Sequence, residues 1–277
     1  MPLSGASATS GARSPSHVAS PPRLALGIDA ATSAWSTNNA KGFGHLSNVV
    51  YESNATVAAD LKRLGATDVK FFSKNGSAGF VAVCRDRVIV AFRGTEEHDK
   101  ADWGHDLDIG LVPRLGGRVH EGFSNSLDSL WPQMSAELKR LVTEKERPVF
   151  LTGHSMGGAM ATLAALELAN DGITPRAVYT YGSPPVGDAA FAAAYDKAVP
   201  GTHRVVNQTD DVPRLLAPGY EHVGEERYLS SDGDAQTGTG FFGKFLDRFS
   251  RRLDEPVGAG ITDHRMNTYE KMLAQLR

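Results

Sequence analysis

One short segment of the chain carries the residue pattern of an activated serine. Residues Gly153 to Gly157 match G-x-S-x-G, with Ser155 at the centre. The pattern follows the apolar run Val149 to Thr152, which predicts a buried strand, and precedes the Ala- and Leu-rich run Met156 to Asn170, which predicts a helix. A serine hydroxyl is a good nucleophile only when a base lies beside it and the oxygen is held clear of the backbone. A sharp strand-to-helix turn holds the oxygen in this way, so the segment predicts acyl-transfer chemistry at Ser155.

Such a serine needs a base and an acid, and after this kind of turn they follow in the order acid, then histidine. Three histidines follow Ser155: His203, His222 and His264. His203 opens a predicted strand, which favours a structural role. His222 and His264 both lie in loop-like segments, where catalytic side chains are commonly carried. Chain order favours His264 and leaves His222 open.

The acid is expected just past the strand that ends at Val206, where Asp210 and Asp211 stand side by side before Val212 and Pro213. An acid there would accept the imidazole N–H, fix its tautomer and stabilise the imidazolium ion. The alternative interpretation is a polar turn before a proline, because Asp is common in turns. The residues alone do not separate Asp210 from Asp211.

Strands and helices alternate from Pro148 onward, which indicates a mainly parallel sheet with helices on both faces. Earlier in the chain, turns separate three short apolar runs, which predict antiparallel strands on the N-terminal side of the sheet. The predicted helices cover residues 55–64, 122–146, 156–170 and 189–198, and the predicted strands cover residues 69–72, 79–84, 87–92, 149–152, 177–181 and 204–206. Residues 1–23, rich in Ser, Ala, Gly and Pro, predict a disordered tail before a single domain of residues 24–277.

The composition argues against several classes of protein. A net charge of -3 and the lack of a dense basic run argue against nucleic-acid binding. The single cysteine, Cys84, allows no internal disulfide and no thiolate metal cluster, and its apolar neighbours predict a buried side chain. No metal or other cofactor is expected, since H-E-x-x-H is also absent. No apolar run approaches the ~20 residues that span a membrane. No secretory signal is visible, and the compartment stays open.

A second glycine pattern, Gly238 to Gly243, matches the G-x-G-x-x-G of dinucleotide-binding proteins. That motif needs a strand directly before it, within a βαβ unit. A polar stretch from Ser230 to Thr237 stands there instead, so a chance match is favoured. The phenylalanines in and after the pattern favour a core role over a place in a substrate pocket; they are Phe241, Phe242, Phe245 and Phe249.

From about His45 onward the chain resembles the class 3 lipases, a family of fungal triacylglycerol lipases and their bacterial relatives. The resemblance rests on several motifs in the same order. They are the segments 90–95, 102–107, 119–123, 153–157, 210–215, 220–224 and 263–264. The family's D-x-V-P pattern places the acid on Asp210, and its base falls on His264. Its oxyanion hole would fall on Thr95 and on the backbone N–H of Met156.

The resemblance implies an α/β-hydrolase fold and a carboxylic ester hydrolase, first of all a triacylglycerol lipase or esterase that works through an acyl-enzyme without a cofactor. Phospholipase and aromatic-acid (feruloyl-type) esterase are alternatives on the same fold, because pocket shape decides the ester. A non-catalytic interaction protein with this fold is the remaining alternative. The expected partners are a lipid or other ester substrate and, transiently, a lipid interface.

The resemblance also implies a lid within residues 96–112. Trp103, Leu107 and Leu111 recur every four residues, so a helix would place them on one face. That face either covers an acyl groove or packs against the body of the protein. The acidic residues of the segment outnumber its single lysine, Lys100, by five, which predicts repulsion from anionic interfaces and weak interfacial activation; they are Glu96, Glu97, Asp99, Asp102, Asp106 and Asp108.

Overall fold

The fold is described from a computed structural model, which covers residues 27–94, 110–207, 210–214, 219–230, 235–237 and 264–276. The predicted tail of residues 1–23 lies outside these ranges, as does the glycine pattern of residues 238–243 with its phenylalanines. The division into a tail and one domain therefore stays a prediction.

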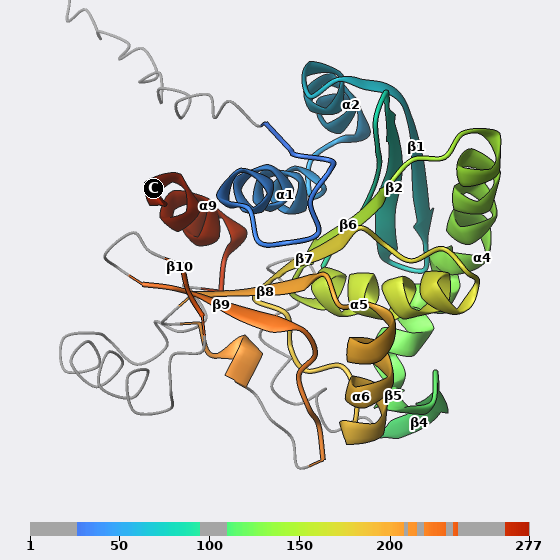
Figure 1. The fold of residues 1–277 in the computed structure, drawn as a ribbon, viewed down its shortest axis with the longest axis vertical. Coiled ribbons are helices and arrows are strands. Elements are labelled where there is room, and N and C mark those ends of the chain that lie inside the picture. Colours follow the sequence, from blue (N-terminus) through green and yellow to red (C-terminus); the bar gives the residue numbers. More distant parts are fainter. Residues whose placement is uncertain are drawn as a thin grey trace, which may run out of the picture.

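An eight-stranded sheet lies at the centre, in the order β1-β2-β3-β6-β7-β8-β9-β10 (Figure 1). The strands are β1 (Ala66–Lys74), β2 (Ser77–Cys84), β3 (Val88–Phe92), β6 (Val149–His154), β7 (Ala177–Tyr181), β8 (Thr202–Asn207), β9 (Glu225–Leu229) and β10 (Ala235–Thr237). From β3 through β6, β7 and β8 to β9 all neighbours are parallel. The pairs β1–β2 and β2–β3 are antiparallel, and so is the pair of β9 with β10. This confirms the prediction of a mostly parallel sheet with antiparallel strands on its N-terminal side.

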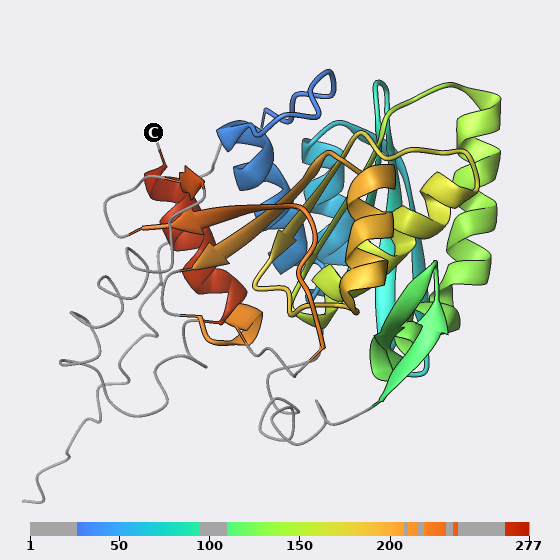
Figure 2. The ribbon, with the colours of Figure 1, turned by 60° about the horizontal axis from the view of Figure 1, so that its bottom comes forward.

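Helices cover both faces of the sheet (Figure 1; Figure 2). On one face lie α1 (Thr37–Val49), α2 (Asn54–Arg63) and α9 (Met266–Gln275), and on the other lie α4 (Glu121–Glu144), α5 (Met156–Asn170) and α6 (Ala189–Ala198). Successive side chains of a strand point to opposite faces. In β3, accordingly, Val90 packs with the second group of helices and Ile89 with the first, and both are fully buried. The arrangement is that of the predicted α/β-hydrolase fold.

The bounds of α5 and α6 agree with those predicted. The small side chains of α5, among them Ala161 and Ala164, are fully buried, which lets this helix lie directly on the sheet. Helix α6 begins after Asp188, whose side chain accepts a hydrogen bond from the N–H of Phe191 at 2.9 Å. An Asp in this position satisfies an amide that the helix itself leaves unpaired.

Helix α1 was not predicted, because glycine and asparagine disfavour helix formation and α1 contains several of them. The structure gives Gly44 a packing role. A Cβ atom at Gly44 would lie 2.6 Å from Cδ1 of Leu273 in α9, so glycine lets the two helices approach closely without a shift of the Leu273 side chain. Tertiary packing therefore outweighs the low intrinsic helix propensity of α1.

The prediction that Leu111 shares a helical face with Trp103 and Leu107 is wrong at Leu111. Leu111 lies in β4 (Leu111–Arg114), which pairs antiparallel with β5 (Gly117–His120) as a separate hairpin (Figure 2). A two-residue turn joins the strands, and Leu115 and Gly116 both adopt positive φ angles, of 55° and 84°. Such a turn matches the twist of a hairpin, and it overrides the four-residue spacing of apolar side chains. Trp103 and Leu107 lie outside the described residues.

The structure bears on two further predictions. Cys84 is 2 % exposed in β2, which confirms that it is buried, and burial raises the pKa of its thiol. Within the described ranges, no helix combines the length and the apolar character that a membrane span requires.

Candidate active site

Ser155 lies on a sharp turn between the end of β6 and the start of α5. Its φ and ψ angles are 58° and −130°, a conformation that is rare for any residue other than glycine. The Ser155 N–H donates a hydrogen bond to the carbonyl of Tyr181 in the adjacent strand β7, at 2.9 Å. Strain of this kind persists only where the surroundings enforce it, and it is characteristic of a nucleophile elbow.

The two glycines of the motif are required by close backbone contacts. A Cβ atom at Gly153 would lie 2.2 Å from the carbonyl oxygen of Gly157. A Cβ atom at Gly157 would lie 2.3 Å from the carbonyl oxygen of Phe92 in β3. Real Cβ atoms do not approach backbone atoms so closely, so the turn can form only with glycine at both positions.

We expect Gly157→Ala to lower the free energy of unfolding by about 3 kcal/mol, because the methyl group collides with the backbone of β3, which is held in the sheet. Urea unfolding followed by circular dichroism measures this change. Gly110→Ala is the matched control: a Cβ atom there meets nothing within 4 Å, so the expected change is within about 0.5 kcal/mol. Equal stability of the two variants would contradict the proposed role of Gly157.

Three buried side chains form a hydrogen-bonded line at the elbow. Nε2 of His264 lies 2.8 Å from Oγ of Ser155, and Nδ1 of His264 lies 2.8 Å from Oδ2 of Asp210. Their exposed fractions are 1 % for Ser155, 2 % for His264 and 0 % for Asp210. A carboxylate accepts hydrogen bonds only, so Nδ1 carries the proton and donates it to Asp210. The lone pair of Nε2 therefore faces the Ser155 hydroxyl.

The loop after β8 selects Asp210 rather than Asp211 for this contact. The Asp210 N–H donates to the carbonyl of Asn207 at 3.1 Å, and Oδ1 of Asp210 accepts from the N–H of Val212 at 2.9 Å. Asp211 is only partly buried. The tight turn thus directs the first of the two carboxylates toward His264.

The other two candidate histidines bond to backbone carbonyls elsewhere. Nε2 of His203 donates to the carbonyl of Ser33 at 3.0 Å, and burial lowers the pKa of His203, which favours the neutral ring. Nε2 of His222 donates to the carbonyl of Pro213 at 2.5 Å. The first contact ties a loop to strand β8, and the second joins two segments outside the sheet. The structure brings His264, and neither His203 nor His222, to Ser155.

Comparison with known proteins identifies the family. A family model described as "Lipase (class 3)" matches residues 89–219, from β3 through the elbow and past Asp210. A secreted mono- and diacylglycerol lipase A of Penicillium cyclopium is 33% identical over 198 residues, which cover 69% of this chain and 61% of that protein. The chain belongs to the class 3 lipase family.

Two other family relatives are informative. Phospholipase A1-II 4 of Oryza sativa subsp. japonica is 33% identical over 196 residues, which cover 57% of this chain and 49% of that protein. A solved triacylglycerol lipase, described as having a serine protease triad as its catalytic centre, matches with a TM-score of 0.62 and 25% identity, over 73% of this chain and 84% of that one. The chain spans about half to three fifths of the length of the curated relatives it matches.

Tyr269 of α9 completes the surroundings of the acid, and the sequence analysis missed it. Its hydroxyl donates a hydrogen bond to Oδ2 of Asp210 at 2.6 Å and accepts one from the N–H of Asn207 at 3.1 Å. Its ring packs edge-on against Tyr181, with centroids 6.2 Å apart. The only sequence signal is a tyrosine five positions after His264, at the start of the final helix.

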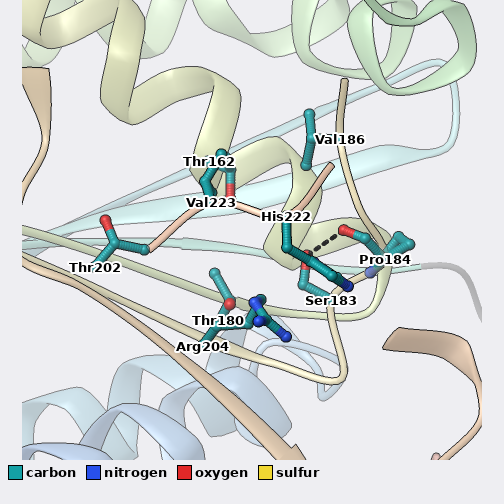
Figure 3. Close-up of a pocket in the computed structure, with 9 residues that line it drawn as sticks. All are labelled: Thr162, Thr180, Ser183, Pro184, Val186, Thr202, Arg204, His222 and Val223. Atoms are coloured by element: carbon teal, nitrogen blue, oxygen red, sulfur yellow. Dashed lines mark hydrogen bonds between the residues drawn. The ribbon is translucent and has the colours of Figure 1, made fainter. Parts of the chain in front are cut away.

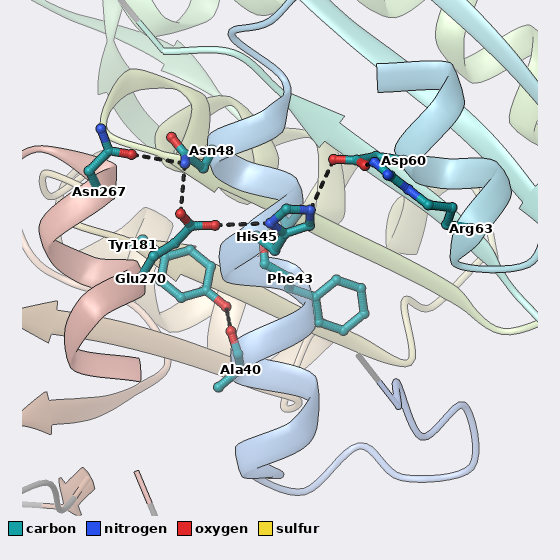
Figure 4. Close-up of polar contacts among 10 residues, drawn as sticks. Ala40, Phe43, His45, Asn48, Asp60, Arg63, Tyr181, Asn267 and Glu270 are labelled. Carbon is teal, nitrogen blue, oxygen red and sulfur yellow. Dashed lines mark hydrogen bonds and ion pairs between the residues drawn. The ribbon is translucent and has the colours of Figure 1, made fainter. Parts of the chain in front are cut away.

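A polar cluster fixes α9 to α1 and α2 (Figure 4). Nδ1 of His45 in α1 lies 3.0 Å from Oε1 of Glu270 in α9, and its Nε2 lies 3.2 Å from Oδ2 of Asp60 in α2. The side-chain amide of Asn48 donates to Oε2 of Glu270 at 2.8 Å and to Oδ1 of Asn267 at 3.0 Å. Because α9 begins directly after the loop of the candidate base, this cluster helps to set the position of that base.

We expect Tyr269→Phe to lower kcat about 10-fold and to lower the free energy of unfolding by about 2 kcal/mol. The buried carboxylate of Asp210 loses a hydrogen bond to a charged acceptor, and such bonds contribute about 1.5–3 kcal/mol. Kinetics on a soluble ester, beside urea unfolding, measure both changes. Tyr195→Phe is the control, since it removes a buried hydroxyl that bonds to Thr202 at 2.8 Å, away from the triad. A kcat equal to that of Tyr195→Phe would argue against the role of Tyr269.

The predicted oxyanion hole is described in part. Met156 is the first residue of α5, next to Ser155, so its N–H lies at the positive end of the helix dipole. Thr95 lies outside the described residues, but Gly94 before it is described. A Cβ atom at Gly94 would lie 3.3 Å from Cβ of Ser155 and 2.6 Å from the carbonyl oxygen of His154. The chain therefore passes directly beside the nucleophile as it enters the Thr95 position.

A small polar cavity lies beside α5, between that helix and strands β7 and β8 (Figure 3). It is lined by Thr162, Thr180, Ser183, Pro184, Val186, Thr202, Arg204, His222 and Val223. Its volume of about 10 Å³ is room for about one water molecule. Arg204 pairs there with Glu226 at 3.1 Å, and burial lowers the pKa of its guanidinium. The cavity is far too small for an acyl chain.

No group of His, Cys, Asp and Glu side chains within the described ranges is arranged to hold a metal ion.

Proposed function

We propose that the chain is a serine ester hydrolase in which Ser155 is the nucleophile, His264 the general base and Asp210 the acid that orients the base. The observation that carries the proposal is the buried hydrogen-bonded line from Asp210 through His264 to Ser155, with 2.8 Å at each step. Ser155 also stands on a strained turn between a strand and a helix. Nucleophile, base and orienting group in this geometry are the parts that acyl transfer needs.

The reaction proceeds through an acyl-enzyme. Oγ of Ser155 attacks the ester carbonyl carbon while Nε2 of His264 takes the hydroxyl proton. The imidazolium ion is stabilised by Asp210 and then gives its proton to the leaving alcohol. A water molecule, deprotonated by the same nitrogen, attacks the acyl-enzyme, and the acid leaves as Ser155 regains its proton. No step requires a cofactor.

The negative oxygen of each tetrahedral intermediate needs preorganised donors. We assign these to the backbone N–H groups of Met156 and Thr95, with the Thr95 hydroxyl as a further donor. The position of Met156 at the start of α5 and the closeness of the Gly94 backbone to Ser155 support this assignment. At position 156 the donor is the backbone N–H, so the identity of the Met156 side chain matters little.

For the substrate we propose acylglycerols, as the name of the Penicillium cyclopium relative suggests. The rice relative is named a phospholipase A1, which favours phospholipids as the second candidate. Both substrates present a glycerol ester to the same nucleophile, and they differ in what the surrounding pocket must accept.

A comparison of substrates tests the proposal. Purified protein is incubated with p-nitrophenyl butyrate, with mono-, di- and tributyrin, and with short-chain phosphatidylcholine, and acid release is followed by pH-stat. We expect hydrolysis of the p-nitrophenyl ester and of at least one butyrin, at rates above that on phosphatidylcholine. Faster release of acid from phosphatidylcholine than from the butyrins would make phospholipids, rather than acylglycerols, the proposed substrate class. If no ester is hydrolysed, the enzymatic proposal is wrong and a non-catalytic interaction protein takes its place.

A further inference from the structure

His154, the residue before the nucleophile, forms a hydrogen-bonded link that the mechanism above does not use. Its Nε2 lies 2.6 Å from the backbone carbonyl oxygen of His264, and its Nδ1 lies 3.2 Å from the hydroxyl of Tyr51. The Tyr51 hydroxyl in turn accepts a hydrogen bond from the N–H of Gly94 at 3.1 Å. The link therefore runs from the candidate base, past the nucleophile, to the end of β3, where the predicted oxyanion segment begins.

The partners determine where the protons lie. A carbonyl oxygen only accepts, so Nε2 of His154 carries a proton and donates it to His264. The Tyr51 oxygen accepts from Gly94 and has one proton of its own to donate. A neutral His154 ring accepts that proton at Nδ1, and every group in the link is then satisfied. His154 is 1 % exposed, so an unsatisfied nitrogen there would be costly.

The rings of His154 and His264 lie close together, with centroids 4.6 Å apart and an angle of 35° between their planes. During catalysis His264 becomes an imidazolium ion. A second positive charge at this distance, in a buried site, would oppose that step. A neutral His154 adds no charge beside the imidazolium ion and so does not oppose that step. The hydroxyl of Tyr51, by occupying the Nδ1 lone pair, supports the neutral form.

We propose that Tyr51 and His154 are positioning residues. They hold His264 and the chain that leads from Gly94 to Thr95 in fixed positions relative to each other, on either side of Ser155. Neither touches the reacting atoms. His154 fixes the backbone of His264, and Tyr51 fixes the N–H of Gly94, the residue before Thr95. Because the two residues bond to each other, a displacement on one side of the nucleophile is transmitted to the other. The inference rests on the proposed function, since the relative position of the base and the oxyanion donors matters only if Ser155 attacks an ester.

A double-mutant cycle on the full chain tests the link, with kcat and KM measured on p-nitrophenyl butyrate. Tyr51→Phe keeps the ring and removes the hydroxyl. His154→Gln keeps a donor for the His264 carbonyl and removes the nitrogen that faces Tyr51. We expect each single variant to lower kcat about 10-fold, with KM changed less than about twofold, because misplacement affects the transition state more than substrate binding. The double variant should lose about 10- to 20-fold rather than 100-fold, since either change already breaks the link.

Tyr179→Phe is the matched control. Its hydroxyl also accepts a backbone N–H, from Ser36 at 3.2 Å, and donates to a carbonyl, that of Ala34 at 3.4 Å, but it lies away from Ser155. Thermal unfolding of all variants separates loss of folding from loss of catalysis. We expect Tyr179→Phe to keep the kcat of the wild type even if its melting temperature is lower.

Two results would overturn this positioning role without contradicting the proposal that the chain is a serine ester hydrolase. One is an active wild type in which Tyr51→Phe keeps a kcat within about twofold. The other is a set of effects that multiply in the double variant, which would mean that the two residues act independently. A wild type that neither hydrolyses the ester nor is labelled at Ser155 by an organophosphate would overturn the hydrolase, and the positioning role with it.

Discussion

Ser155→Ala is expected to lower kcat on p-nitrophenyl butyrate about 10⁵- to 10⁶-fold, to the level left by binding and oxyanion stabilisation alone. Alanine fits the turn as serine does but has no oxygen to attack the ester, so no acyl-enzyme can form. Among the residues that the structure describes, the Ser155 hydroxyl bonds only to His264. The folded state should therefore persist, with a melting temperature close to that of the wild type.

Ser47→Ala is the control for this variant. Ser47 is a second fully buried serine, and its hydroxyl lies 2.8 Å from that of Thr152 in β6. Its removal costs about 1 kcal/mol of stability and should leave kcat unchanged. Hydrolysis by Ser155→Ala at a rate comparable with the wild type would exclude Ser155 as the nucleophile.

Asp210→Asn is expected to lower kcat about 10⁴-fold, the loss seen when the same change is made in a serine-protease triad. Within the described part of the chain, three donors converge on this carboxylate. His264 and Tyr269 both donate to Oδ2, and the N–H of Val212 donates to Oδ1. An asparagine side chain has one acceptor atom and one donor atom, so it must place an N–H against at least one of these donors. The orientation that spares Val212 presents a donor to His264 and favours the wrong imidazole tautomer.

The neighbouring acid provides the control for this prediction. Asp211→Asn makes the same chemical change one residue later, on a partly buried side chain. Its kcat should stay within a few-fold of the wild type. A loss in Asp211→Asn as large as that in Asp210→Asn would show that the loop as a whole, and not the contact with His264, is responsible. The pair is measured with the same ester, beside urea unfolding of each variant.

Local sequence patterns predicted the elements that position the nucleophile. Helix α5 has its predicted bounds, Met156–Asn170, and the strand before it was predicted within two residues of its end. Both elements are strongly apolar and sit deep in the core, so their patterns agree with their surroundings. The choice of Asp210 and His264 depended on the family resemblance, because neighbouring acids and loop histidines carry no local signal of which one faces Ser155.

The residues missed by sequence reasoning are those whose roles arise from tertiary contacts. Tyr51 lies in the turn between α1 and α2, and Tyr269 lies in α9, yet both hydroxyls meet groups far away in the chain. Helix α1 was missed for a related reason. Gly44 lowers its helix propensity but permits its packing on α9. Leu111 shows the reverse error, since a regular spacing of apolar side chains suggested a helix where a tight turn forms a hairpin.

Covalent trapping of the nucleophile tests the central claim most directly. The wild type and His264→Ala are incubated with diethyl p-nitrophenyl phosphate, p-nitrophenol release is counted per protein molecule, and the adduct is located by peptide mass spectrometry. The structure predicts one p-nitrophenol per wild-type molecule, one diethylphosphoryl group on Ser155, loss of ester hydrolysis in the labelled protein, and greatly slowed labelling of His264→Ala. An adduct on a different residue, or full ester hydrolysis by protein already labelled at Ser155, would contradict the account.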